Sequence, residues 1–462
     1  MNPEVATASA ADHSLSRSLR PRHVTMITIG GIIGAGLFVS SSAAIAAAGP
    51  AVVISYALTG TLVLLVMRML GEMAVAMPDV RSFTEFARAG LGDWAGFTIG
   101  WLYWYFWVIV IPAEAIAGAL IIQQWLPQLS MLVIGTVLMV VMTCVNLMSA
   151  RSYGEFEFWF SLVKVVAILA FIAVTASYAF GLIGPKVSTF GNLTAHGGFM
   201  PLGPVPVLAT VTTVFFSMMG AEIVTIAAAE SPEPARAVAR MVSTVVWRIL
   251  FFYIISLFLI VSVIPWTTVK PGFSPFAAAL DAMHVPYTSA IMKVIILTAV
   301  LSCLNSSFYI CSRVLFVLAG RGAAPRWLVV TNARHVPARS VLLGALAGFA
   351  GVIASIYSPN LVFRFLVNAS GALIVYIYIA IAVSQIRTRR QRERAGVATT
   401  GLRMWFFPWA SYLAIAAMIA VLVAMAASPA LRSQMWASVV SVAVALLAYM
   451  GVRQRRANRT TG

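Results

Sequence analysis

Charged residues are few in this sequence. Asp, Glu, Lys and Arg make up 10% of its 462 residues, whereas 61% are hydrophobic. Because an average soluble domain carries about 25% charged residues, these charges could not cover a water-exposed surface of this size. A protein solvated by lipid needs no such cover. The shortage of charge therefore excludes an ordinary soluble protein and favours an integral membrane protein.

Cysteines are also few, and clusters of acidic residues are lacking. The three cysteines, Cys144, Cys303 and Cys311, all lie in apolar runs, so we expect no disulfide framework, no metal cluster and no cofactor. The acidic clusters with which a membrane-bound transferase would hold a metal diphosphate are lacking, so an enzyme is not expected. The first apolar run begins near Val24 without a small-residue cleavage site, and no cleavable signal peptide is predicted.

Long apolar runs are what the sequence has in abundance. Runs of about 20 residues are read as membrane-spanning helices. The predicted spans are 22–46, 50–77, 94–124, 130–150, 156–182, 205–229, 242–265, 288–320, 339–358, 361–386, 405–427 and 434–452. The fold class expected is thus an all-α polytopic membrane protein with about twelve transmembrane helices.

The basic residues alternate from loop to loop. Most of the 31 Lys and Arg fall in the two tails and in every second loop, whereas the opposite loops hold only Lys186, Lys270 and Arg432. By the positive-inside rule, both termini are cytoplasmic. A basic face for nucleic acid would not alternate with hydropathy, so the net charge of +17 does not indicate a nucleic-acid partner.

The expected organisation has two repeats and a terminal pair of helices. It comprises a cytoplasmic tail (1–20), a first five-helix repeat (21–182), an external connector (183–204), a second, inverted five-helix repeat (205–386), a basic cytoplasmic linker (387–403), helices eleven and twelve (404–452) and a cytoplasmic tail (453–462). The sequence does not set the oligomeric state.

The first and sixth spans carry helix-weakening signals. Span one reads TIGGIIGAGLFVSSS, with four glycines between residues 30 and 36, and span six carries SMMGAE, which includes Gly220 and Glu222. Each glycine costs about 1 kcal/mol in a helix relative to alanine. Two broken helices five spans apart indicate an inverted-repeat transporter with its substrate site at the breaks. Their free N–H and C=O groups suit the two charges of an amino acid. Close helix packing through small residues is the alternative.

The same segments, with others along nearly the whole chain, carry a family resemblance. They include LRPRHVTMITIGGIIGAGLF, GPAVVISYALTG, MRMLGEMA, WAGFTIGWLYWYFWV, FFSMMGAEIVTIAAAESPEP, LSCLNSSFYICSRVLF, FLVNASGALIVYIYIAIAVSQ and LRMWFFPW. The sequence resembles the bacterial proton-coupled amino acid permeases of the amino acid–polyamine–organocation superfamily. Spans six and eight and LRMWFFPW are most similar to the γ-aminobutyrate permeases. Members for proline or aromatic amino acids share much of the pattern.

The resemblance implies an activity and a set of binding residues. The activity is import of a small zwitterionic amino acid, γ-aminobutyrate or similar, by proton symport with alternating access. A permease for another amino acid, or an exchanger, is the alternative. By resemblance, the substrate carboxylate is bound by Gly34, Ala35 and Gly36, and its amino group by Ile32, Phe216 and Met219. Phe216 also matches an aromatic residue that gates the occluded substrate.

Three buried charges are candidates for proton coupling. An ionisable side chain at a helix centre costs at least about 2.5–3.5 kcal/mol, so each one requires a reason. Glu222, midway along span six, and Lys164, in span five, match positions associated with protons in the family, and Glu114 follows Pro112 in span three. Protons are therefore an expected partner. A carboxyl satisfied by backbone, for Glu222, and snorkelling to the interface, for Lys164, are the alternatives.

For other polar residues, a structural role is the alternative to a role in the site. Ser302, Asn305 and Ser307 in span eight are candidates for pocket walls, and interhelical hydrogen bonding explains them almost as well. Glu72 and Glu155 lie among basic residues near predicted cytoplasmic ends, so we expect structural ion pairs there. The aromatic stretch WLYWYFW at 101–107 is expected to serve helix packing. A channel or a nutrient sensor is less consistent with these features than a transporter.

Overall fold

The computed structural model describes residues 21–460, apart from 35, 79, 81, 185–188, 230–233, 398–400, 428 and 430. Within these residues the protein consists of helices joined by turns and loops, without a β-strand. The first half contains α2 (Pro21–Ile32), η1 (Gly36–Ser40), α3 (Ser41–Ala48), η2 (Gly49–Ala51), α4 (Val52–Ala76), α5 (Phe83–Leu91), α6 (Asp93–Gln123), α7 (Met131–Leu147), α8 (Ala150–Ala179) and α9 (Asn192–Ala195).

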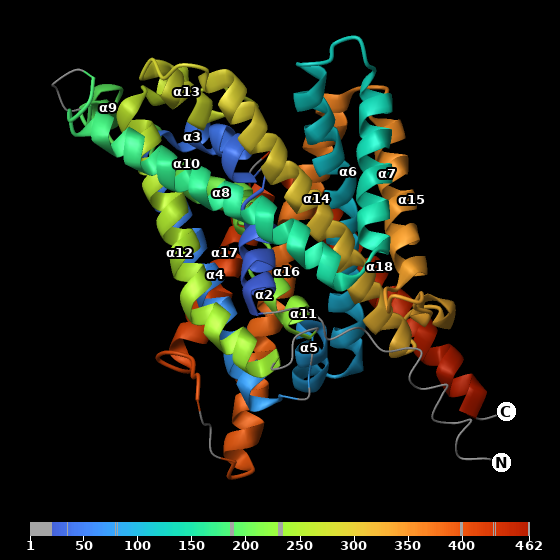
Figure 1. Ribbon diagram of the computed structural model, residues 1–462. Coiled ribbons are helices and arrows are strands. Elements are labelled where there is room, and N and C mark those ends of the chain that lie inside the picture. The colour runs from blue at the N-terminus through green and yellow to red at the C-terminus, as the bar shows by residue number, and fades with distance from the viewer. Residues whose placement is uncertain are drawn as a thin grey trace.

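The second half is helical in the same way. It contains α10 (Pro204–Met218), α11 (Ile223–Ala229), α12 (Pro234–Val263), η3 (Trp266–Thr268), α13 (Pro275–Ala282), α14 (Thr288–Gly320), η4 (Arg326–Val329), α15 (Ala338–Ala354), α16 (Pro359–Arg394), α17 (Trp409–Ala427) and α18 (Arg432–Thr460). Figure 1 shows these helices as a bundle, with α3 and α13 towards one end and α5 and α11 towards the other.

The helices are long and apolar enough for a membrane. Among the described residues, seven stretches meet the length and hydropathy of a span, and four further apolar helices are shorter. The prediction of an all-α polytopic membrane protein is confirmed. Twelve spans account for these helices when α2 with α3, and α10 with α11, each form one interrupted span. That the two halves are inverted repeats stays a prediction.

Helices α6 and α14 form the centre of the bundle. About 72% of the most apolar part of α14 and 67% of that of α6 is buried, against 11% for α18. Small residues allow the close contacts that membrane helices need. A Cβ on Gly351 of α15, for example, would lie 2.3 Å from Pro112 of α6. The site described below is lined by residues of these two central helices, and the C-terminal end of α18 projects from the bundle (Figure 1).

Local sequence sets several helix starts. The hydroxyl of Ser130 accepts from the N–H of Val133 at the start of α7, and Ser149 does the same for Ser152 at the start of α8. Such N-caps satisfy N–H groups that have no partner within the helix. The serines therefore fix where the fourth and fifth spans begin.

The structure adds helix where none was predicted. The short helices α5 and α13 lie outside the predicted spans, and α16 continues to Arg394, well into the stretch predicted as the linker 387–403. Arg389 explains the extension, since it pairs with Glu393 at 2.9 Å and stacks over Phe407 at 4.0 Å. The basic residue Arg389 thus stabilises a helix in this stretch.

The motif LRMWFFPW closes one end of the bundle around Glu72. The carboxylate of Glu72 accepts from the N–H of Met404 at 2.7 Å and from Gln385 at 3.0 Å, and it lies 3.4 Å from Arg389. Arg68 stacks over Trp405 at 3.9 Å. The ion pair predicted for Glu72 is confirmed, as is the one for Glu155, which lies 2.6 Å from Arg22.

The orientation of the chain is testable by labelling. With the endogenous cysteines replaced, a cysteine introduced at Gln128, in the α6–α7 turn, should react with an impermeant maleimide on intact cells. A cysteine at Ala395, just after α16, should react only after permeabilisation, because the basic loops remain inside. Labelling of both positions on intact cells would contradict the predicted topology.

Candidate functional site

At the break in the first interrupted span, two backbone carbonyl groups accept hydrogen bonds from side chains of other helices. Helix α2 ends at Ile32, and the next helical turn begins at Gly36. The Ile32 carbonyl accepts a hydrogen bond from the hydroxyl of Tyr253 at 3.0 Å, and the Ile33 carbonyl accepts one from the ammonium of Lys164 at 2.8 Å. Side chains from α12 and α8 therefore hold the broken end of α2, which is the usual way in which free backbone is tolerated in a membrane.

The second interrupted span meets the first. Helix α10 ends at Met218 and α11 begins at Ile223, with Gly220 at φ +103°, a conformation that favours glycine. The hydroxyl of Ser217 donates to the carbonyl of Gly36 at 2.9 Å. Tyr253 donates to the Ser217 carbonyl at 2.7 Å as well as to α2. The two breaks are thus fastened to each other by hydrogen bonds.

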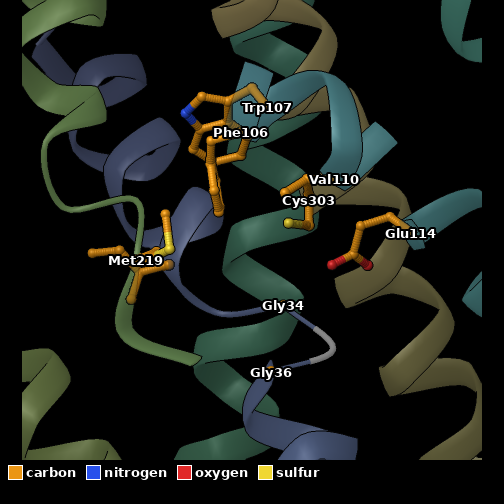
Figure 2. A pocket seen from close by; sticks show the side chains of 9 residues that line it. Gly34, Gly36, Phe106, Trp107, Val110, Glu114, Met219 and Cys303 are labelled. Atoms are coloured by element: carbon orange, nitrogen blue, oxygen red, sulfur yellow. The ribbon is translucent and has the colours of Figure 1, made fainter. Parts of the chain in front are cut away.

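A pocket lies where the two breaks meet α6 and α14. It is a small pocket, with about 310 Å³ of space between its lining atoms, part of which is open to solvent. Its lining residues are Ile32, Gly34, Gly36, Phe106, Trp107, Val110, Glu114, Met219 and Cys303. Figure 2 shows the backbone of the first break on one side, with side chains of α6 and α14 above it and Met219 opposite.

Glu114 is the only carboxylic acid among the pocket-lining residues. Its side chain is 3% exposed and points towards the first break and Cys303 (Figure 2). Cys303 hydrogen-bonds to it, and the second carboxyl oxygen, Oε2, has no hydrogen-bond partner. A buried acceptor left without a partner costs about 1–3 kcal/mol. The pocket therefore presents an acceptor that a bound donor would satisfy.

Glu222 lies in the second break but not among the pocket-lining residues. It is fully buried, and its two carboxyl oxygens accept from Tyr103 of α6 at 3.1 Å and from Tyr378 of α16 at 2.9 Å. The sequence offered backbone groups as the alternative partners of this carboxyl. Backbone groups of Gly220 and Glu222 itself do hydrogen-bond to the carboxyl, and the two tyrosine hydroxyls in addition link the second break to α6 and α16.

Lys164 belongs to a buried polar network behind the pocket. It is fully buried in α8, and besides the Ile33 carbonyl it donates to the hydroxyl of Ser302 at 2.7 Å. Ser302 in turn donates to Glu157, a second fully buried charge on α8. The carboxylate of Glu157 also accepts from Ser161 at 3.2 Å. The snorkelling alternative for Lys164 does not fit this position.

The predicted site residues fall into three groups. Ile32, Gly34, Gly36, Met219 and Glu114 line the pocket together. Ala35 and the side chain of Phe216 lie outside the described part of the structure, so the gating role of Phe216 stays a prediction. Lys164, Glu222, Ser302, Asn305 and Ser307 are buried but are not among the nine pocket-lining residues.

The predicted wall of span eight bonds to helices instead. Asn305 contacts Asn146 of α7 at 2.8 Å and Glu157 at 3.4 Å, and Ser307 donates to the Cys303 carbonyl of its own helix at 2.7 Å. The interhelical alternative therefore describes Ser302 and Asn305. The wall of span eight is formed by Cys303. A direct contact of the three polar residues with substrate stays a prediction.

Sequence reasoning missed part of the site. Phe106, Trp107 and Val110 line the pocket from α6, although the stretch 101–107, which contains Phe106 and Trp107, was assigned to packing. A signal was present: Phe106, Val110 and Glu114 are spaced four residues apart and share one helix face. Glu157 was also missed, and its spacing of seven residues from Lys164 places both on one face of α8.

Comparison with known proteins places the chain among transport proteins. The model of the family described as amino acid permease matches residues 23–459. The gamma-aminobutyric acid permease of Bacillus subtilis (strain 168) is 44% identical over 443 residues, which cover 96% of this chain and 94% of that protein. The protein of the same name from Escherichia coli (strain K12) is 44% identical over 432 residues, 91% of each chain.

Two further comparisons show how far the similarity extends. The aromatic amino acid transport protein AroP of Corynebacterium glutamicum is 36% identical over 437 residues, covering 92% of this chain and 93% of that one. Among solved structures, a mutant of a manganese transporter from Eremococcus coleocola matches with a TM-score of 0.60 over 93% of this chain and 92% of that chain, at 13% identity. At that identity the likeness concerns the fold alone.

Proposed function

Because the chain belongs to the amino acid permease family, we propose that it imports γ-aminobutyrate, or a similar small zwitterion, together with protons. Transport proceeds by alternating access across the inner membrane of a bacterium, with both termini in the cytoplasm. The observation that carries the proposal is the pocket at the meeting of two broken helices, lined by backbone of the first break and by one buried carboxyl.

The pocket has groups suited to both charges of such a substrate, the carboxylate and the ammonium group. Beyond Gly36 a helical segment begins. The first N–H groups of a helix have no partner within it and suit a carboxylate, although here the N–H of Leu37 donates to the Gly34 carbonyl at 3.3 Å. The unpartnered Oε2 of Glu114 suits an ammonium group. The Ile32 carbonyl already accepts from Tyr253, which leaves one lone pair for the ammonium that the sequence assigned to it.

The walls of the pocket favour a short substrate. Phe106 and Trp107 both line the pocket, and their rings take up much of its wall. A linear four-carbon amino acid needs no side-chain pocket, whereas an aromatic amino acid does. An aromatic or proline permease is the second candidate, because AroP of Corynebacterium glutamicum shares the family at 36% identity.

Energy coupling is proposed to use the buried charges around the two breaks. Lys164 holds the Ile33 carbonyl at the first break, Glu222 connects the second break to α6 and α16, and Glu114 lines the pocket. A change of protonation at any of them would alter bonds that differ between outward-open and inward-open states. Lys164 is the main candidate, because it contacts the break directly as a full charge.

Competition for uptake tests the substrate assignment. Proteoliposomes containing the purified protein should take up labelled γ-aminobutyrate saturably. Unlabelled γ-aminobutyrate and its close linear analogues should displace the label at least about tenfold more effectively than proline or phenylalanine, if the pocket selects a linear chain. Butyrate and butylamine, which lack one charge each, serve as controls and should compete poorly.

The reverse order would overturn the narrower assignment. If phenylalanine or proline displaced the label far better than unlabelled γ-aminobutyrate, the protein would carry another amino acid. Counterflow with vesicles preloaded with unlabelled substrate separates a transporter from a channel, because a channel cannot drive label against its gradient.

A further inference from the structure

We propose that Glu157 is the proton partner of Lys164, and that the hydroxyl of Ser302 relays the proton between them. The proposal deepens the proposed function and rests on it, since it concerns how a proton-coupled permease would couple. Glu157 and Lys164 lie seven residues apart on α8, both fully buried, and Ser302 of α14 contacts both.

The hydrogen bonds run in one direction, from Lys164 through Ser302 to Glu157, and so form a relay. The ammonium of Lys164 donates to Ser302 Oγ at 2.7 Å, and Ser302 Oγ donates to Glu157 Oε1. A hydroxyl can accept one hydrogen bond while it donates another. One concerted shift then breaks an Nζ–H bond and forms an Oγ–H bond, while the original Oγ–H bond breaks and an Oε1–H bond forms. A charged pair becomes a neutral pair, and no other reactant is consumed.

The surroundings of Glu157 suit both states of the pair. Asn305 and Ser161 donate to the carboxylate, so it is stabilised by hydrogen bonds when charged. Without a nearby opposite charge, a buried ammonium would be very costly, and Glu157 supplies that charge at the distance of one hydroxyl group. As a neutral pair, the two groups lose their mutual attraction but also the cost of burying two charges.

The shift has a mechanical consequence at the first break. Lys164 also donates to the Ile33 carbonyl at 2.8 Å, and a hydrogen bond from a charged donor is roughly twice as strong as one from a neutral donor. Transfer of the proton to Glu157 therefore weakens the hold of α8 on the broken end of α2. Ser161, which also donates to the Met26 carbonyl at 2.8 Å, links the carboxylate side of the pair to α2 as well.

Other ionisable groups face the relay from neighbouring helices. Glu114 of α6 and Cys303 of α14 interact electrostatically with Lys164, and Tyr153 of α8 interacts with Glu157. From α12, Tyr253 bonds to the Ile32 carbonyl, next to the one held by Lys164. Asn146 of α7 contacts Asn305 and carries no charge.

The decisive variants remove the relay while keeping the helices in place. Ser302→Ala removes the hydroxyl, Ser302→Thr keeps one, and Glu157→Gln keeps hydrogen bonding without a titratable group. Ser262→Ala is the matched control, because that serine is fully buried and donates only to the Phe258 carbonyl of its own helix. Each variant is reconstituted and assayed with labelled γ-aminobutyrate for counterflow at equal pH and for accumulation driven by a pH gradient.

The relay predicts that variants without it keep counterflow but lose accumulation driven by a pH gradient. Ser302→Ala and Glu157→Gln should keep counterflow within about twofold of the wild type and lose accumulation by at least about tenfold, a normal size for a coupling free energy. Ser302→Thr and Ser262→Ala should retain both. A purely structural role of Ser302 would lower both activities in parallel, and that parallel loss would overturn the relay.

Two other results are informative. Full pH-driven accumulation by Ser302→Ala would exclude the hydroxyl as the carrier and overturn the proposal directly. Failure of the proposed function has a different signature, because the wild-type vesicles themselves would then show no counterflow of γ-aminobutyrate. The melting temperature of each purified variant, measured in detergent, identifies a loss that is due to misfolding.

Discussion

Gly36→Val is expected to abolish uptake while leaving the protein in the membrane. A Cβ at Gly36 would lie 2.7 Å from the Cα of Ser217, which is a backbone atom that cannot rotate away. The carbonyl of the same glycine accepts from the Ser217 hydroxyl. A branched side chain would therefore push the two broken helices apart where they are fastened together. A shift of about 1 Å at such a site can reduce a rate by about a hundredfold.

The measurement is initial uptake of labelled substrate, normalised to the amount of protein in the membrane. Gly451→Val is the matched control, since that glycine lies in α18 with no neighbouring atom within 4 Å of its Cβ position, and it should transport normally. Because overpacking costs about 1–3 kcal/mol, some loss of thermal stability in Gly36→Val is also expected. Normal affinity and rate in this variant would remove the segment from the site.

Gly34→Ala provides a graded comparison. Its Cβ would meet side chains rather than backbone: Cys303 Cβ and Sγ at 3.2 Å and Glu114 Oε1 at 3.6 Å. All three residues line the pocket, so the added methyl group occupies substrate space without separating the helices. We expect a higher KM with little change in membrane expression. The sequence assigned both glycines to carboxylate binding, and the structure adds a packing role for Gly36.

The breaks were predictable from sequence because their cause is local. Four glycines within seven residues, and a glycine two residues before a glutamate in an apolar span, weaken a helix wherever it packs. The structure breaks both helices at these points. The alternatives of helix packing and substrate binding were not exclusive. Gly36 serves the packing of α10 against the first break, and it also lines the pocket.

The polar network was not predictable in the same way, because it depends on which helix faces which. Glu155 and Glu157 are two residues apart, about 200° around a helix, and the sequence does not say which of them faces inwards. Glu155 pairs with Arg22 at the surface, whereas Glu157 is fully buried. Likewise, the tyrosines that hold Glu222 come from α6 and α16, which are far away in sequence.

Lys164→Gln is expected to leave substrate exchange intact and to remove accumulation against a gradient. The driving force at stake is large. A proton that moves inwards across 100 mV contributes about 2.3 kcal/mol, and each pH unit contributes about 1.4 kcal/mol. Together they would support a substrate gradient of several hundredfold if the two movements are coupled. Without coupling, the protein can only equilibrate its substrate.

The structure gives the physical reason for choosing this lysine. Its ammonium bridges the Ile33 carbonyl at the first break and the Ser302 hydroxyl of α14. Charged, it holds three helices together, and neutral, it holds them more weakly. Glutamine can still donate a hydrogen bond, but it carries no charge and releases no proton. Binding should therefore survive in the variant, while the dependence of the conformational equilibrium on pH should not.

Glu222→Gln is the comparison that separates the candidates. Of its two tyrosine partners, Tyr103 and Tyr378, one can donate to the amide oxygen and the other can accept from the amide NH₂ group, so the fold should persist. A loss of accumulation equal to that of Lys164→Gln would make this carboxyl a second proton carrier. If Lys164→Gln retains full pH-driven accumulation, the lysine is a structural cation. Coupling then passes to Glu222 or to Glu114, whose unpartnered oxygen faces the pocket.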